Sequence, residues 1–140
     1  MTLDPLFLLL RTVFEDLLGS LRRELPRRGF DDLHSSQYVF FEVARDGASP
    51  SELAADLKLS KQSVNHLLGQ LQDRGYVLRD EGQDARSRRV HLTEKGHAAA
   101  AAIRSILDGY ERRWAEDMGE KDLDSLLSTL ARMVRILEEG

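Results

Sequence analysis

Cysteine is absent from the 140-residue sequence. Its absence excludes a disulfide scaffold, a zinc ribbon, a thiolate nucleophile and a thiol-based redox sensor, because each of these needs sulfur. Long apolar runs are absent too: the longest one near the N-terminus spans Leu6 to Leu10, whereas crossing a bilayer takes roughly 20 residues. No basic segment precedes that run, so no secretion signal is indicated. We therefore expect a cytoplasmic protein with no membrane partner.

Basic residues are fewer than acidic residues in the chain as a whole, but not in its middle segment. Lys and Arg number 20 and Asp and Glu 24, for a net charge of −4, which taken whole argues mildly against a nucleic-acid partner. By segment, the net charge is −4 over residues 1–57, +3 over 58–95 and −3 over 96–140. The basic middle segment can approach phosphate, and the acidic flanks predict weak binding to DNA of unrelated sequence.

Hydrophobic periodicity predicts long helices at both ends of the chain. Large apolar residues recur at three- and four-residue spacings through residues 1–28, with Asp4 as N-cap and Pro5 in the first turn. Further helices are expected from Glu94 to about Met118 and from Gly119 to Glu139. The N-terminal apolar stripe is too broad for one neighbouring helix to cover, which suggests burial from two sides or in a partner.

Between these ends, capping residues delimit three shorter helices. The first is expected from Ser35 or Ser36 to Arg45, and the second from Glu52 to Leu57 behind a capping box that begins with a serine. The third runs from Lys61 to about Arg74, again behind a serine N-cap. Two short helices joined by a tight turn, the second opened by a serine, indicate a helix-turn-helix.

After Gly75 the apolar period changes from that of a helix to that of a strand. Tyr76–Arg79 and Arg88–Leu92 are strand-like, and the polar residues 80–87 between them suit a turn. This pattern predicts a hairpin with a basic tip. A helix-turn-helix followed by a hairpin is a winged helix-turn-helix, so the predicted fold class is mainly α with a small β-hairpin, an α+β arrangement flanked by long helices.

Five fragments, in this order and spacing, resemble the MarR family of bacterial transcriptional regulators. The resemblance is close from about Ser35 to Gly96, and the flanking helices match in length, position and apolar character. The fragments are Ser51-Glu52-Leu53-Ala54, Ser60-Lys61-Gln62-Ser63-Val64-Asn65, Leu71-Gln72-Asp73-Arg74-Gly75-Tyr76-Val77, Asp84-Ala85-Arg86 and Leu92-Thr93-Glu94-Lys95-Gly96.

The resemblance implies a single MarR-like domain over residues 1–140. In it, residues 35–95 form the winged helix-turn-helix DNA-binding region, and residues 1–28 and 96–140 form dimerisation helices. It therefore implies a homodimer that binds double-stranded operator DNA and regulates transcription. Two recognition helices would enter successive major grooves with half-site centres roughly 10 bp, or a small multiple, apart. We expect repression from a pseudo-palindromic operator.

The polar face of the helix that begins at Lys61 supplies the candidate DNA contacts. Amide side chains pair bidentately with adenine, so Gln62 and Asn65 are expected to read bases. The serines and the lysine at the helix start suit phosphate. At position 66 the resembling family most often has arginine, whereas histidine carries no permanent charge. The alternative is an ordinary solvated polar face. The candidates are Ser60, Lys61, Gln62, Ser63, Asn65, His66, Gln70 and Arg74.

Arginines crowd the predicted hairpin tip. Arg86, Arg88 and Arg89 lie within four positions, and an arginine on a loop can enter the minor groove and respond to its width and potential. The resemblance implies that Asp84 steadies the wing while Arg86 meets DNA. Arg88 is a further candidate, but strand parity leaves open whether it or Arg89 faces DNA, the other facing solvent or an acid such as Glu81.

Neither catalysis nor a metal site is indicated. The histidines at 34, 66, 91 and 97 show no spacing that puts two ligands on one helical face, and no cysteine completes a set. There is no nucleophile elbow, phosphate loop or paired-carboxylate motif in a recognisable context. We expect no enzyme activity, no metal and no cofactor. Two alternatives stay open: a metal-dependent regulator that uses the histidines, and a winged helix that binds a protein instead of DNA.

The resemblance also implies release from DNA by a small, often aromatic or phenolic, effector. Such a molecule would bind between the dimerisation layer and the winged helix, in a cleft lined by Phe14, Tyr38, Phe41, Tyr110 and Trp114. Residues of this kind at helical spacing are more often core. An effector would have to favour one spacing of the recognition helices over another, since equal affinity for both states shifts nothing.

Overall fold

The computed structural model describes residues 4–44, 47–80 and 88–140. By its internal contacts the chain divides into two compact units, Met1–Ser105 and Ile106–Gly140. Among the described residues, no helix combines the length and the apolar character that crossing a membrane requires.

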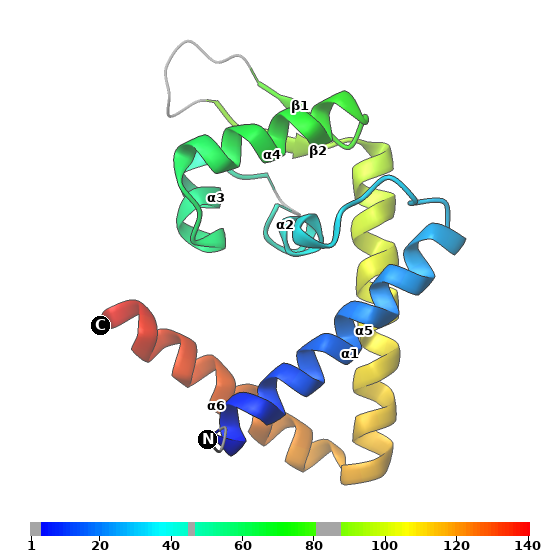
Figure 1. Ribbon diagram of the computed structural model, residues 1–140, viewed down its shortest axis with the longest axis vertical. Coiled ribbons are helices and arrows are strands. Elements are labelled where there is room, and N and C mark those ends of the chain that lie inside the picture. Colours follow the sequence, from blue (N-terminus) through cyan, green and yellow to red (C-terminus); the bar gives the residue numbers. More distant parts are fainter. Residues whose placement is uncertain (1–3, 45–46, 81–87) are drawn as a thin grey trace. The chain divides into compact units, whose positions relative to one another are not determined.

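The first unit is a winged helix-turn-helix preceded by a long helix (Figure 1). Its two strands pair antiparallel, with Val77 opposite Leu92 and Arg79 opposite Val90. This confirms the predicted class of a mainly helical fold with a small hairpin. In chain order the elements are α1 (Pro5–Arg27), the 3-10 helix η1 (Ser35–Gln37), α2 (Tyr38–Val43), α3 (Pro50–Leu57), α4 (Lys61–Asp73), β1 (Val77–Arg79), β2 (Val90–Leu92) and the first part of α5 (Glu94–Met118).

Three predicted N-caps are confirmed. In each, a side-chain oxygen accepts a hydrogen bond from a backbone N–H two or three residues later, which satisfies a donor that the helix leaves unpaired. The pairs are Asp4 with Leu6 at 2.9 Å, Ser49 with Glu52 at 3.1 Å and Ser60 with Ser63 at 3.1 Å. Because Pro50 occupies the first turn of α3, that helix begins two residues before the predicted start.

The helix predicted from Ser35 or Ser36 to Arg45 is divided in the structure. A 3-10 turn comes first, and the six-residue α2 follows it and ends at Val43. The cause is a local cap, in which His34 Nδ1 accepts from the Ser36 N–H at 3.3 Å and the Gln37 side chain accepts from the His34 N–H at 2.9 Å. Such side-chain bonds to nearby backbone compete with the regular helical pattern.

The core of the first unit joins α2, α3, α4 and the root of the hairpin. Phe41 is fully buried and meets Phe40 and Tyr76 edge to face, with ring centroids 5.4 and 5.7 Å away. Phe41, expected as a possible cleft residue, therefore lies in the aromatic centre of this core. The other fully buried side chains of the helix-turn-helix are Leu53, Val64, Leu68 and Leu71.

The second unit consists of the end of α5 and the helix α6 (Glu120–Glu139). Gly119, with φ of 91°, separates the two helices, a backbone conformation that favours glycine. In α5 the rings of Tyr110 and Trp114 contact each other edge to face at 5.7 Å. In α6 Leu123 is buried. The large apolar side chains that remain exposed along α6 are Leu126, Leu127, Val134, Ile136 and Leu137.

Candidate nucleic-acid interface

Helix α4 lies along the hairpin (Figure 1). It presents one apolar and one polar face. The inward side chains are all buried: Val64, Leu67, Leu68 and Leu71. The outward ones are all exposed: Lys61, Gln62, Ser63, Asn65 and His66. Burial of the apolar stripe fixes the rotation of the helix about its axis, so the polar face meets solvent as an ordered row of donors and acceptors.

Two serines organise the N-terminus of α4. The Ser60 hydroxyl accepts from the Ser63 N–H and donates to Ser63 Oγ at 3.0 Å. Its proton is therefore committed to the cap, whereas the Ser63 hydroxyl keeps its own proton for another acceptor. The amides of the first turn carry the partial positive charge of the helix, so this end suits a phosphate.

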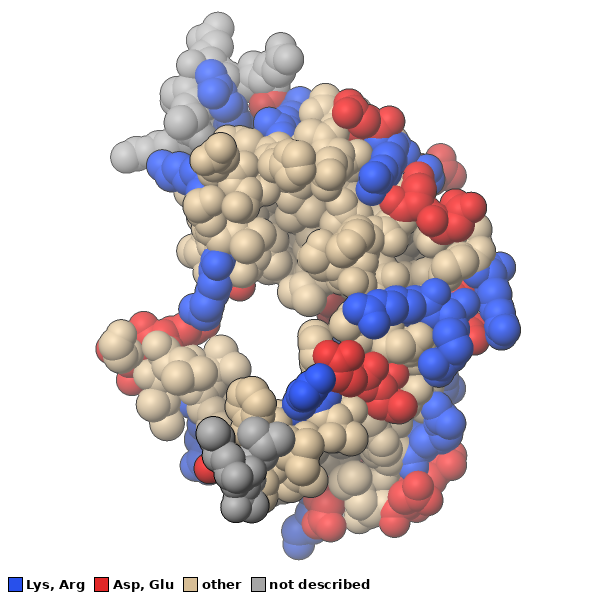
Figure 2. Space-filling model, in the orientation of Figure 1, with Lys and Arg blue, Asp and Glu red and all other residues tan. Residues whose placement is uncertain are grey.

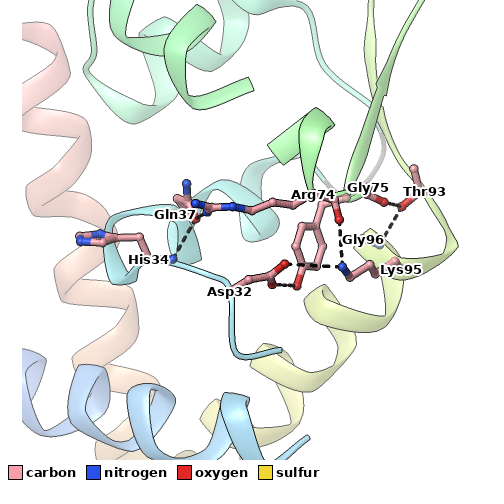
Figure 3. A network of polar contacts seen from close by, with 9 residues as sticks. Asp32, His34, Gln37, Arg74, Gly75, Thr93, Lys95 and Gly96 are labelled. Atoms are coloured by element: carbon pink, nitrogen blue, oxygen red, sulfur yellow. Dashed lines mark hydrogen bonds and ion pairs between the residues drawn. The ribbon is translucent and has the colours of Figure 1, made fainter. Parts of the chain in front are cut away.

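Gln70 and Arg74 are held at the far end of α4 by a buried glutamine, Gln37, which is seen beside Arg74 in Figure 3. Gln37, only 2% exposed, donates from Nε2 to Gln70 Oε1 at 3.0 Å. Its Oε1 accepts from Arg74 Nη1 at 3.5 Å. These contacts attach the C-terminal half of α4 to η1, and a buried amide with several partners is stable only while all of them stay in place.

The wing residues expected at the hairpin tip, Asp84 and Arg86, lie outside the described residues. Arg88 is exposed. Arg89 is half-buried, donates from Nη2 to the Gly47 carbonyl at 3.2 Å, and places Nη1 3.7 Å from the Glu52 carboxylate. The alternation along the strand left open whether Arg88 or Arg89 faces DNA. In the structure, Arg89 attaches the hairpin to α3 and to the loop before it.

A cleft of about 530 Å³ separates the outer side of α4 from the root of the hairpin. Arg79, at the end of β1, lines it and donates from Nη2 to the Asn65 carbonyl at 3.1 Å. Sequence reasoning missed this residue as a candidate, because its partner is a main-chain atom on another element. The lining residues are Pro50, Asn65, Gln72, Arg79, Asp80, Arg88, Arg89 and Val90.

The joint between the hairpin and α5 is built around the fragment Leu92–Gly96 (Figure 3). The Thr93 hydroxyl donates to the Gly75 carbonyl at 2.6 Å and accepts from the Gly96 N–H at 3.1 Å. At Gly96 a Cβ would lie 2.2 Å from the Tyr76 carbonyl oxygen. Glycine alone allows so close an approach of α5 to the turn after α4.

Asp32 and Lys95, which lie next to each other in Figure 3, complete the joint around Tyr76. The Tyr76 hydroxyl donates to Asp32 Oδ1 at 2.5 Å, and Lys95 Nζ lies 3.7 Å from Asp32 Oδ2 and 4.3 Å from the Tyr76 ring centroid. Burial acts to raise the pKa of Asp32, but the Tyr76 hydrogen bond and the Lys95 charge outweigh it, so this pKa lies below its ordinary value of 3.8. Burial and the hydrogen bond to Asp32 raise the pKa of Tyr76 above its ordinary 10.0.

We expect Asp32→Asn to lower the free energy of unfolding by about 1 kcal/mol at neutral pH, because one hydrogen bond weakens and a partly exposed ion pair adds little. Since folding lowers the pKa of Asp32, its contribution is present above about pH 3.8 and is lost as the pH falls through the folded-state pKa. Folding raises the pKa of Tyr76, so the stability that its neutral hydroxyl contributes is fully present below about pH 10. That stability is lost as the pH rises through the folded-state pKa. Urea unfolding across both ranges measures these slopes.

The control for this prediction is Asp31→Asn, which alters an exposed carboxylate next to the same site. We expect this control to keep the acid profile of the wild type, whereas Asp32→Asn flattens it. An Asp32→Asn variant that loses stability in acid as steeply as the wild type would show that another carboxylate carries the effect.

The residues expected to line an effector cleft lie in different surroundings. Phe14 is on α1 and is 54% exposed. Tyr38, at the start of α2, is buried, and burial raises the pKa of its hydroxyl. Phe41 belongs to the core, and Tyr110 and Trp114 belong to the second unit. Within the first unit, Phe14 and Tyr38 therefore remain as candidate contacts for an aromatic molecule.

Basic side chains gather on the surface of the segment whose net charge is positive (Figure 2). Figure 2 shows lysine and arginine side chains on the surface around the hairpin and α4, with acidic side chains among them. This is the part of the chain, residues 58–95, whose net charge is +3. In the described ranges, no three His, Asp or Glu side chains come together as a metal site would require.

A family model and one sequence relative connect the chain to known regulators. A model of the MarR family matches residues 37–87. The exopolysaccharide II synthesis transcriptional activator ExpG of Rhizobium meliloti is 32% identical over 118 residues, which are 82% of this chain and 61% of that protein. The chain thus spans about three fifths of the length of this relative.

Solved structures share the fold over almost the whole chain. FabT of Streptococcus pneumoniae, solved in complex with DNA, has a TM-score of 0.81 at 20% identity, covering 96% of each chain. The transcriptional repressor CouR, solved bound to a 23-mer DNA duplex, has a TM-score of 0.73 at 28% identity, covering 92% of this chain and 89% of the other. At 20% identity the first likeness concerns the fold alone.

Proposed function

This chain belongs to the MarR family of winged helix transcriptional regulators, and from that premise we propose that it binds operator DNA as a homodimer and regulates transcription. The observation that carries the proposal is the exposed polar face of α4, which stands beside the root of the wing and opposite a fully buried apolar stripe. Its amide side chains match the donor and acceptor pattern of the major groove. The family is one of regulators and not of enzymes.

Base reading is assigned to Gln62 and Asn65. Both are exposed in the first half of α4, the part of a recognition helix that contacts base edges. His66 is exposed one position further on and offers a single donor when neutral. Gln70 and Arg74, which bond to Gln37, are assigned to holding α4 in place.

Phosphate contacts are assigned to the helix start and to the wing. Lys61 and Ser63 are exposed at the positive end of α4, next to the Ser60 cap. In the wing, Arg88 is exposed and is assigned to a phosphate of the DNA. Arg89 bonds to Gly47 and Glu52. Arg86 is proposed to enter the minor groove, with Asp84 steadying the loop.

Dimerisation is supported by apolar side chains that a single chain leaves exposed. Those on α1 are Leu6, Phe7, Leu8, Leu9, Leu10, Val13 and Phe14. Contiguous exposed apolar surface of this kind marks an interaction site. A two-fold dimer carries two copies of α4, so the operator is proposed to be a pseudo-palindrome with half-site centres roughly 10 bp, or a small multiple, apart.

Regulation is proposed to be repression, by a dimer that occupies DNA needed by the polymerase. The similar protein CouR is named a repressor, whereas ExpG is named an activator. The position of the operator relative to the promoter separates these outcomes, and a reporter gene driven by the selected operator measures the sign.

An aromatic or phenolic effector is proposed to release the DNA, with Phe14 and Tyr38 as candidate contacts. It must favour one spacing of the two α4 helices over another. Titration of aromatic acids and phenols into the operator complex tests release. Unchanged affinity with every compound, at concentrations that saturate binding to the protein, would refute the proposal.

Selection of bound duplexes from a random pool with the purified protein tests the function directly. We expect an enriched pseudo-palindrome, which would support readout and dimerisation together. A pool without enrichment overturns the proposal. If the protein is also not retained on heparin or duplex DNA at physiological salt and a pull-down captures a protein partner, the winged helix is instead a protein-interaction module.

In that assay Asn65→Ala and Gln62→Ala are each expected to reduce the preference at one base pair per half-site by about tenfold or more, because a bidentate pair is lost. Lys61→Ala is the contrasting variant, since a phosphate contact affects all sequences alike and its loss lowers the salt slope by about 1. If the amide variants select the operator with the same preference as the wild type, the base readers are assigned wrongly.

A further inference from the structure

Arg79 makes a contact that crosses from the wing to the recognition helix. It is the last residue of β1, paired with Val90 on β2, and is half-buried at the root of the hairpin. Its Nη2 donates to the main-chain oxygen of Asn65 at 3.1 Å, over a sequence separation of 14 residues. The guanidinium of Arg79 is therefore bonded to the main chain of Asn65, and the side chain of Asn65 is exposed on the polar face of α4.

The position is not one that packing alone would favour. Arg79 Nε is buried and has no hydrogen-bond partner among the described residues. A buried donor without an acceptor is unfavourable, and such a group calls for an explanation other than stability. A shorter apolar side chain could fill the strand end without that cost.

We propose that Arg79 is a positioning residue, which sets the angle between wing and recognition helix and thereby aims the Asn65 amide at its base pair. The inference rests on the proposed DNA-binding function. The Asn65 carbonyl is part of a rigid helix, so a bond to it from the side restrains the first turns of α4 against the hairpin. Bidentate reading by an amide tolerates little misplacement, so this restraint acts on sequence preference.

A direct phosphate contact by Arg79 is the competing explanation. The residue lines the cleft together with Arg88 and Arg89, and an arginine that neutralises a phosphate contributes to affinity for every sequence. The two roles differ in what they change. Positioning alters the preference between sequences, whereas a phosphate contact alters the salt slope and the affinity for all duplexes.

The test uses Arg79→Met, which removes the donors and keeps most of the length, and Arg79→Lys, which keeps one charged donor. Affinities are measured over a salt series for the selected operator, for the operator changed at the base pair that Asn65→Ala identifies, and for a scrambled duplex. Thermal melts verify folding. Arg27→Met, at an exposed arginine in the last turn of α1, is the control for loss of one positive charge.

We expect Arg79→Met to lower the preference at that base pair by about tenfold, with the scrambled-duplex affinity and the salt slope close to those of Arg27→Met. Arg79→Lys is expected to retain most of the preference. In an Asn65→Ala background Arg79→Met should cause no further loss of preference, because the side chain that it aims is gone.

Three results would overturn the inference. Equal loss for operator and scrambled duplex with a salt slope lower by about 1 would make Arg79 a phosphate contact. If Arg79→Met keeps the wild-type preference at that base pair, the bond to Asn65 does not aim the helix. The same conclusion follows if Arg79→Lys loses as much of this preference as Arg79→Met does. If the wild type itself selects no sequence, the proposed function fails first. If the wild type selects an operator and Asn65→Ala relaxes the preference, the proposed function stands and these results test only the role of Arg79.

Discussion

Replacing Gly96 with alanine is expected to lower the free energy of unfolding by about 3 kcal/mol or more. The new Cβ would lie 2.2 Å from the Tyr76 carbonyl oxygen and 3.1 Å from the Leu92 Cβ. That carbonyl accepts the Thr93 N–H at 3.0 Å, and the Tyr76 side chain is fully buried, so neither can retreat alone. Relief requires α5 to separate from the turn after α4, which breaks the Thr93 joint.

The matched control is Gly109→Ala on the same helix. Beyond its chain neighbours and the backbone of its own helix, no described atom lies within 4 Å of where the Cβ would be, so this change is expected to stabilise the protein by about 0.5–1 kcal/mol through helix propensity. Urea unfolding monitored by circular dichroism measures both variants. Similar small effects at the two glycines would mean that α5 moves away from the Tyr76 carbonyl at little cost and that the joint is not rigid.

Local patterns predicted most of the element boundaries, because caps act over two or three residues. Ser60 opens α4 as expected, and its oxygen finds the Ser63 N–H. The same locality explains the division of the helix predicted from Ser35: the cap made by His34 and Gln37 is also local, but its donors and acceptors are not those of the usual capping residues.

The contacts that hold the candidate site together could not be predicted in the same way. Gln37 meets Gln70 across 33 residues and Arg79 meets the Asn65 main chain across 14, and neither bond leaves a periodic trace in the sequence. Strand parity likewise could not separate Arg88 from Arg89. The contact that Arg89 makes depends on where the loop before α3 places the Gly47 carbonyl, 42 residues away from it. Composition and spacing thus identify the polar face of α4, whereas the tertiary contacts of its residues follow only from the fold.

Leu10→Asp is expected to convert the protein to a monomer and to weaken operator binding by about 10³-fold, because two linked half-sites bind far more tightly than one. Leu10 lies on α1 among apolar side chains that the single chain leaves exposed, and is itself 42% exposed. Folding of one chain therefore tolerates a carboxylate there. An apolar dimer interface does not, because a buried charge without a partner costs several kcal/mol.

Ser105→Asp is the control, since it adds the same charge at an exposed position of α5 in the same unit, outside the apolar surface of α1. Sedimentation measures the oligomeric state, and titration of the selected operator and of an isolated half-site measures the affinity. We expect Leu10→Asp to bind the half-site like the wild-type protein while losing the advantage of the full operator. If Leu10→Asp stays dimeric and binds the full operator at wild-type affinity, the α1 face does not hold the dimer. The two copies must then meet through another apolar surface, of which the exposed row on α6 is the remaining candidate among the described helices.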